Sequence, residues 1–263
     1  MPNSAEPHSQ VWTAMAWDGK KSILAPDLHF NRLFRHSQIL GIEINDDLPK
    51  IILNKLEKQD QFENLDELNY EIPFLVKIII KKDGEIFIQT RKNKHWQDDP
   101  LQAISMKLPD FELPILGTKH GNWQPYDEAR KQAINHDSDI ALLFKNNLLI
   151  DGDYCLPLML DNDGVAYHPS NVDGALDSVT LQFLRNDVEE LGIPIRSAKI
   201  NLKMLSRASE LIVIGSGMGV CSVGSIDGTP IGKPKGKLYQ VARAVWLNKL
   251  NNDWQNWNFL REL

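Results

Sequence analysis

The hydrophobic positions in the first part of the chain follow two periods, one typical of strands and one typical of helices. Residues 11–17 predict a strand, and residues 21–24 continue it after an Asp-Gly turn. Apolar residues at helical spacing predict a helix over residues 26–40, which Gly41 ends, and a second helix over residues 48–56. The chain therefore begins with strands followed by two amphipathic helices.

A β-hairpin is the clearest element of the next segment. Residues 74–80 and 85–91 are rich in β-branched residues, and Asp83-Gly84 supplies the turn between them. A weaker strand is predicted near residues 104–108. Up to residue 108 the pattern therefore predicts an α+β domain with an antiparallel sheet.

Residues 109–114 contain two prolines and separate this part from a longer mixed region. There the pattern predicts helices over 125–135, 176–191, 202–208 and 238–250 and strands over 140–144, 148–150, 156–160, 194–200, 211–214 and 221–223. The strands over 148–150 and 156–160 are expected to pair. We therefore expect two domains, a small α+β domain over residues 1–108 and a larger mixed α/β domain over residues 117–263, with a linker over residues 109–116.

Composition excludes several classes of protein. The chain has 263 residues, of which 42% are hydrophobic and 24% charged, as in ordinary globular domains. The net charge of -6 argues against a broad nucleic-acid-binding face, and no apolar run reaches the ~20 residues of a membrane span. The first ten residues are polar and have neither the basic start nor the apolar stretch of a signal peptide, and Cys155 and Cys221 lie in dissimilar contexts. We expect a cytoplasmic protein with no metal site, no nucleic-acid partner and no membrane partner.

Lys119 is the first candidate for chemistry. It lies in Gly-Thr-Lys-His-Gly-Asn, between an extended connector and a helix start. A lysine that points inward loses its proton more easily, and a neutral amine can attack a carbonyl carbon. The alternative is a solvated loop lysine, which is the more common case.

Four further features have both a functional and a structural interpretation. Arg32 on the first helix could hold a phosphate or lie on the surface, and Asp151 after a strand could face a heterocycle or belong to a turn. The run from Gly215 to Gly219 could bind an anion or form a tight turn. Gly174 precedes a helix whose N-terminus could attract a phosphate or could simply be capped by Asp177 or Ser178. Arg35 and His36 are interpreted as surface and core-edge residues, and Trp123 is the tryptophan expected near a site.

The order of these features resembles that of the class IV pyridoxal-phosphate family. The features are H-x-x-R-L-x-x-x-S around Arg32, K-H-x-N at Lys119, an acid 32 positions later, Gly174 before a helix, and a strand that ends in Gly-Ser-Gly. The family contains branched-chain aminotransferases, D-amino-acid aminotransferases and aminodeoxychorismate lyase. The resemblance implies the D-amino-acid-aminotransferase-like fold, pyridoxal 5'-phosphate as cofactor, an amino-acid-like substrate, a homodimer and a site at the domain interface.

The resemblance also assigns roles to residues. Lys119 would form the Schiff base, Asp151 would lie at the pyridine nitrogen, and the phosphate would be held by Arg32 with Ala175, Leu176 and Ser216. Several positions depart from the family pattern: Asp151 replaces a glutamate, Leu156 an asparagine, and Trp123 or Gln124 a tyrosine, while Gly174-Ala175-Leu176-Asp177 replaces a G-I-T-R-like turn.

Three functions remain open from the sequence. The K-H-x-N stretch favours a lyase that eliminates pyruvate from aminodeoxychorismate to give p-aminobenzoate for folate synthesis. The second possibility is an aminotransferase for branched-chain or D-amino acids. The third is a degenerate relative with little activity, which the departures at Asp151, Leu156 and Asp177 would allow.

Overall fold

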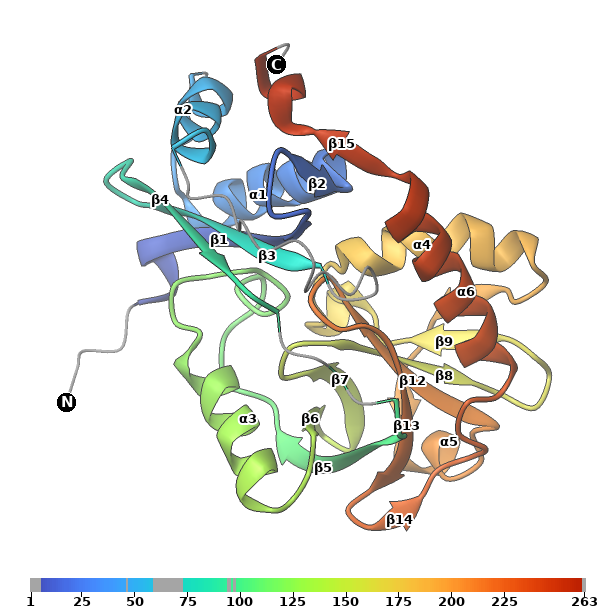
Figure 1. The fold of residues 1–263 in the computed structure, drawn as a ribbon. Helices are drawn as coiled ribbons and strands as arrows, with labels where there is room; N and C mark the ends of the chain where they lie inside the picture. The colour runs from blue at the N-terminus through green and yellow to red at the C-terminus, as the bar shows by residue number, and fades with distance from the viewer. Residues whose placement is uncertain (1–5, 46, 59–72, 94–95, 97, 262–263) are drawn as a thin grey trace. The chain divides into compact units, whose positions relative to one another are not determined.

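The computed structural model describes residues 6–45, 47–58, 73–93, 96 and 98–261. Contacts divide the chain into two compact units (Figure 1). Unit 1 comprises Met1–His95, Lys119–Asn122 and Leu247–Leu263, and unit 2 comprises Trp96–Thr118 and Trp123–Trp246.

Unit 1 is built on an antiparallel sheet. In its described part the strand order is β15-β2-β1-β3-β4, and β1 pairs with β3 along all eight of its residues. Its strands are β1 (Gln10–Trp17), β2 (Ser22–Leu24), β3 (Phe74–Lys81), β4 (Ile86–Arg91) and β15 (Trp254–Asn256). Its helices are α1 (Pro26–Leu40), α2 (Leu48–Leu56) and the short η1 (Pro7–Ser9) and η4 (Trp257–Arg261). The expected strands, helices and hairpin of residues 11–91 are confirmed.

Helix α1 determines which polar groups enter the core of unit 1. Pro26 is tolerated in its first turn, and Gly41 ends it in a left-handed conformation with φ 65°, where its N–H donates to the Ser37 and Gln38 carbonyls. Its buried residues recur at helical spacing and include polar ones: Pro26, His29, Phe30, Arg32, Leu33, His36, Ser37 and Leu40. This face is therefore both the packing face and a source of charged and polar groups.

Unit 2 is built on a larger mixed sheet. Among the described strands the order is β10-β9-β8-β12-β13-β5-β6-β7-β11, and β14 pairs with β13. The strands are β5 (Leu101–Lys107), β6 (Ile140–Lys145), β7 (Leu148–Gly152), β8 (Leu156–Leu160), β9 (Ala166–His168), β10 (Ile195–Ser197), β11 (Ile200–Asn201), β12 (Glu210–Gly215), β13 (Gly219–Ile226) and β14 (Thr229–Pro230). The helices are α3 (Gln124–Asn135), η3 (Asn171–Asp173), α4 (Val179–Glu190), α5 (Leu202–Leu205) and most of α6 (Lys237–Asn252).

Several expectations about strands and helices are wrong in detail. The strand expected over residues 194–200 is two strands, β10 and β11, and the helix expected over residues 202–208 ends at Leu205. Strand β5 does not extend the first antiparallel sheet; it pairs in parallel with β6 and β13, where Leu101 and Ala103 are buried in the core of unit 2. Strand β7 pairs with β6 and β11 rather than with β8, which pairs with β9 and β12. Helix α4 begins at Val179 rather than Leu176, because the Ser178 hydroxyl accepts the Leu181 N–H at 3.2 Å and caps the helix.

The expected domains, residues 1–108 and 117–263 with a linker over 109–116, stay a prediction. The contacts place β5 in unit 2, and they place the C-terminal residues in unit 1, where β15 pairs with β2.

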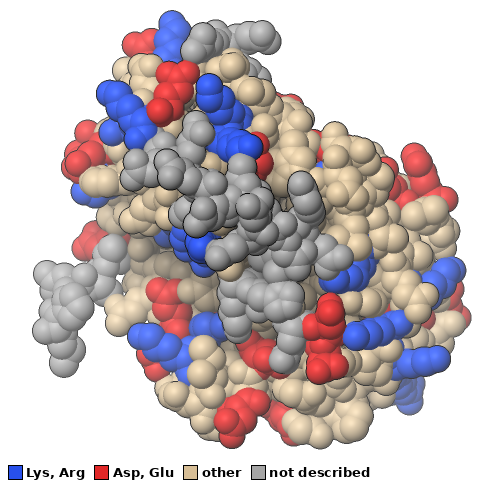
Figure 2. Space-filling model, viewed as in Figure 1, with Lys and Arg blue, Asp and Glu red and all other residues tan. Residues whose placement is uncertain are grey.

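The surface carries both signs of charge. On the face shown in Figure 2, Lys and Arg side chains are interspersed with Asp and Glu side chains. In the part of the chain that the structure describes, no helix combines the length and the apolar character needed to cross a membrane.

Candidate active site

The main chain of Lys119 is fixed to unit 1 on both sides. Its N–H donates to Nδ1 of His36 at 3.1 Å, and its carbonyl accepts the Trp12 N–H at 3.1 Å. The side chain is buried, with 8% of the residue exposed, and Nζ lies 4.4 Å from the centre of a Trp12 ring. Lys119 is therefore an anchored, largely desolvated lysine rather than a solvated loop lysine.

Two glycines flank this lysine because there is no space for a side chain. A Cβ on Gly121 would collide with Ser9 and with the carbonyl of Glu6, both in unit 1. A Cβ on Gly117, which has φ +82°, would lie 2.6 Å from the carbonyl oxygen of Ala175 in unit 2. Close backbone approach thus explains both glycines of Gly-Thr-Lys-His-Gly-Asn.

Arg32 is a buried residue of α1, with 4% exposed, and not a surface arginine. Its Nη2 donates to Oγ1 of Thr13 at 3.0 Å, and the same Oγ1 lies 2.8 Å from Nδ1 of His29. Thr13 and His29 are also buried. Arg32 is therefore held from β1 and from the preceding turn of its own helix.

Buried positive charge dominates the electrostatics of this group. Burial, followed by the charges of Arg32 and Lys119, lowers the pKa of His36 to about 2 and that of His29 well below its usual value. Burial and the Lys119 charge lower the pKa of His120 to about 4. The three histidines are therefore neutral at pH 7, and their surroundings favour an anion.

Asn122 supplies a further polar group at the end of K-H-x-N. Its Oδ1 atom is buried and has no hydrogen-bond partner within the described part of the structure. A buried acceptor without a donor costs about 1–3 kcal/mol. A ligand with an N–H or O–H group would relieve that cost.

The candidate residues of unit 2 centre on Asp151. Its carboxylate is buried and accepts the N–H groups of Leu176 at 3.0 Å and Gly152 at 2.9 Å. Burial and then the negative charge of Asp151 raise the pKa of Tyr126. Trp123 stacks on Tyr126, with ring centres 4.1 Å apart. Asp151 thus lies beside an aromatic pair that the sequence identified only in part, through Trp123.

Asp153, two positions further, has a different environment. Its side chain is fully buried, forms an ion pair with Arg130 at 3.3 Å and accepts the Tyr154 N–H at 2.8 Å. Arg130 also lies over the ring of Trp96. These contacts give Asp153 a structural role, so Asp151 is the better candidate for a cofactor contact.

Ala175, Leu176 and Ser216 lie in loops next to α4. Ala175 is fully buried, and the Leu176 N–H donates to Asp151 rather than to an open space. The Ser216 hydroxyl follows β12 and lies 3.3 Å from the Thr180 hydroxyl in the first turn of α4. The structure thus brings Asp151 to Leu176 and Ser216 to Thr180 within unit 2.

The sequence assigned no role to three polar residues of unit 1: Thr13, His29, which begins the H-x-x-R motif, and His36. The expectation that His36 is a surface or core-edge residue is wrong, since only 3% of it is exposed and it contacts the Lys119 main chain. The signal was present in the spacing, because His29, Arg32 and His36 recur on the same face of α1.

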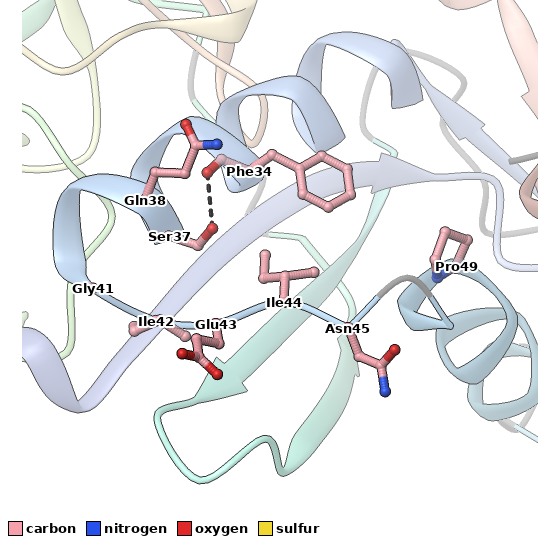
Figure 3. Close-up of a pocket in the computed structure, with 9 residues that line it drawn as sticks. All are labelled: Phe34, Ser37, Gln38, Gly41, Ile42, Glu43, Ile44, Asn45 and Pro49. Carbon is pink, nitrogen blue, oxygen red and sulfur yellow. Dashed lines mark hydrogen bonds between the residues drawn. The ribbon is translucent and has the colours of Figure 1, made fainter.

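A separate hollow lies at the end of α1 in unit 1 (Figure 3). It has a volume of about 1000 Å³, and Phe34, Gln38, Gly41, Ile44 and Pro49 are among its lining residues. None of the predicted site residues lines it. It therefore adds no group to the candidate active site.

The comparisons with known proteins identify the family and the fold of this chain. Residues 10–226 match the family described as amino-transferase class IV. The chain therefore belongs to the class IV aminotransferase family and is a pyridoxal 5'-phosphate-dependent aminotransferase or lyase.

Solved structures of the same fold include both kinds of enzyme. A protein provisionally named 4-amino-4-deoxychorismate lyase from Legionella pneumophila has a TM-score of 0.77 and 20% identity, and the match covers 92% of this chain and 91% of that one. The branched-chain aminotransferase of Thermoproteus uzoniensis has a TM-score of 0.79 and 15% identity, and the match covers 95% of this chain and 90% of that one. The branched-chain aminotransferase of Escherichia coli has a TM-score of 0.76 and 14% identity, with the same shares of the two chains covered. No curated protein sequence matches the chain.

The residues present fit the cofactor. Arg32 and Lys119 make the surroundings of His29 and His36 positive, which suits a phosphate. A buried carboxylate such as that of Asp151 suits a protonated ring nitrogen. The donor chemistry of each group therefore agrees with the family.

Proposed function

We propose that this protein is a 4-amino-4-deoxychorismate lyase, which eliminates pyruvate from its substrate and leaves p-aminobenzoate, a precursor of folate. The observation that supports this choice is the Lys119-His120-Gly121-Asn122 stretch, whose K-H-x-N form resembles aminodeoxychorismate lyase. In this chain the stretch is a fixed part of unit 1, because Trp12 donates to the Lys119 and His120 carbonyls and Gly121 donates to Pro7.

The chain's own residues would act as follows. Lys119 attaches the cofactor and, once released, removes the substrate's α-proton as a base. Arg32 would hold the phosphate, with Ser216 and main-chain groups of Ala175 and Leu176. In this structure the Leu176 N–H donates to Asp151. Asp151 keeps the ring nitrogen protonated. When bound, the cofactor supplies an electron sink for the charge that develops on the substrate.

An elimination needs one substrate, whereas amino transfer needs a second oxo acid and a return half-reaction. The test therefore offers aminodeoxychorismate alone to cofactor-loaded protein and measures pyruvate and p-aminobenzoate. We expect both products in equal amounts, and roughly 10²–10⁴-fold slower formation of both by Lys119→Ala. A visible absorption band from the bound cofactor shows that the sample is loaded.

An aminotransferase is the competing assignment. Panels of branched-chain and D-amino acids with 2-oxoglutarate or pyruvate test it in parallel. Robust amino transfer without elimination would replace the lyase assignment. Inactivity in both assays from loaded protein would favour a degenerate relative, and Leu156 and Asp177 would then be the first residues to replace.

We further propose that the enzyme is a homodimer, as the family resemblance implies, and that it is cytoplasmic, as its two dissimilar cysteines suggest. Light scattering coupled to gel filtration measures the oligomeric state directly. A mass close to 29.9 kDa, that of one chain, would contradict the dimer.

A further inference from the structure

A chain of hydrogen bonds joins Arg32 to two residues that have no assigned role. Thr13 lies on β1, and His29 lies one turn before Arg32 on α1. The exposed fractions of Thr13, His29 and Arg32 are 0%, 1% and 4%. The bond lengths are 3.0 Å from Arg32 Nη2 to Thr13 Oγ1 and 2.8 Å from Thr13 Oγ1 to His29 Nδ1. All three residues belong to unit 1.

The chemistry of these groups determines which one donates in each of the two hydrogen bonds. A guanidinium has only N–H donors, so Thr13 accepts from Arg32. His29 is neutral, because burial and the charges of Arg32 and Lys119 lower its pKa well below its usual value. A neutral imidazole has one acceptor nitrogen. The Thr13 hydroxyl, whose oxygen accepts from Arg32, still has its single proton and can donate it to that nitrogen.

We propose that Thr13 and His29 are positioning residues that orient the Arg32 guanidinium toward the cofactor phosphate, through hydrogen bonds directed from Arg32 to Thr13 and from Thr13 to Nδ1 of His29. His29 then carries its proton on Nε2. This proposal rests on the assignment of Arg32 to the phosphate in the proposed function.

The advantage of these linked hydrogen bonds is that they preorganise the Arg32 side chain. An arginine side chain has many rotamers, and a ligand that must order it binds more weakly. Thr13 belongs to a strand that pairs with β3 along its whole length, so its hydroxyl is a fixed reference point. Loss of the hydroxyl should therefore weaken the contact with the phosphate and leave the remaining cofactor contacts unchanged.

The experiment compares two ligands in the full-length protein. Dissociation constants of pyridoxal 5'-phosphate and of unphosphorylated pyridoxal are measured by absorption for the wild type, Thr13→Val, Thr13→Ser and Arg32→Ala. Thr13→Val keeps the shape and removes the hydroxyl, and Thr13→Ser restores a hydroxyl. We expect Thr13→Val to weaken the phosphate-bearing ligand roughly fivefold to tenfold, to change pyridoxal less than twofold, and Thr13→Ser to recover most of the loss.

The outcomes separate the two proposals. If Arg32→Ala weakens both ligands equally, Arg32 does not hold the phosphate, and the site assignment fails together with this inference. If Arg32→Ala is selective for the phosphate but Thr13→Val is not, the positioning role alone is wrong. Equal weakening of both ligands by Thr13→Val would show a packing effect and would also overturn it.

A second measurement needs no variant. Nitrogen-15 NMR of the histidine rings reports which nitrogen of His29 carries the proton. We expect the Nε2–H form in the wild type. A proton on Nδ1 would reverse the direction of the second hydrogen bond and contradict the proposal even if Thr13→Val did not fold.

Discussion

The two groups of candidate residues are built in different ways. In unit 1, Arg32 and Lys119 have long cationic side chains. The guanidinium of Arg32 is fixed by a hydrogen bond to Thr13, and the main chain of Lys119 is fixed by a hydrogen bond to His36. In unit 2, Asp151 is a short anionic side chain that accepts main-chain N–H groups from the Gly152 and Leu176 loops. One group thus depends on side chains of a helix and a strand, and the other depends on the path of loops.

The two groups also differ in how far they depart from the pattern of the family that the sequence resembles. The unit 1 motifs around Arg32 and Lys119 match closely, and buried neutral histidines surround them. The unit 2 departures at Asp151, Leu156 and Asp177 lie in or next to loops and strand ends. Leu156 is buried in β8, and Asp177 contacts Gln182. The departures from the family pattern that the sequence shows therefore gather in unit 2.

The largest effect is expected at Lys119, the centre of the unit 1 group. Lys119→Ala should lower turnover by roughly 10²–10⁴-fold, because a positioned proton-transfer group is lost. Borohydride reduction of the wild type followed by peptide mapping should place the pyridoxyl label on Lys119. Label on another lysine, with Lys119 unmodified, would remove it from the site.

Asp151 and Asp153 provide a matched pair in unit 2. Asp151→Asn should leave cofactor binding intact and lower turnover roughly 10²-fold, because it removes a preorganised charge. Asp153→Asn should instead destabilise the fold by about 3 kcal/mol, since it breaks the buried pair with Arg130. Thermal unfolding and turnover are measured on both variants. If the two effects exchange places, Asp153 is the cofactor contact.

Arg32→Ala tests the other half of the comparison. It should weaken cofactor binding roughly tenfold or more, because a charge-assisted pair of ~1.5–3 kcal/mol is lost. Arg32→Lys is the matched variant, since it keeps the charge and loses the bidentate fork. Unchanged cofactor affinity in a folded Arg32→Ala protein would show that unit 1 does not hold the phosphate.

The smallest effect is the acid sensitivity of unit 1. The folded-state pKa of His36 is about 2 and that of His120 about 4, both below the unfolded value of ~6.5. Between pH ~6.5 and 4 the unfolded chain therefore binds protons that the folded chain does not, and stability falls as the pH falls. The raised pKa values of Asp153 and Glu210 in unit 2 act in the opposite direction as those groups protonate.

His36→Asn sharpens this point because it keeps an acceptor for the Lys119 N–H but does not titrate. Denaturant unfolding at pH 7 and pH 5 gives the pH dependence of stability for each protein. The variant should lose up to about 1.4 kcal/mol per pH unit of that dependence. The same dependence in both proteins would show that His36 is not buried in its neutral form.

The sequence by itself determined the local elements and the family. The periods of residues 11–91 predicted β1, α1, α2 and the β3–β4 hairpin, because alternation and helical spacing are local consequences of which face is buried. The order of the motifs around Arg32, Lys119 and Asp151 indicated the class IV family, which the match over residues 10–226 shows.

The tertiary structure alone decided which strands pair and which polar residues meet. Strand β5 pairs in parallel with β6 and β13, a contact between segments more than 100 residues apart in the case of β13, and no local pattern specifies such a partner. His36 accepts a hydrogen bond from the main-chain N–H of Lys119, 83 positions away, and every residue type except proline has such an N–H. Backbone contacts of this kind leave no trace in the sequence, because they depend on where the chain passes and not on which side chain it carries there.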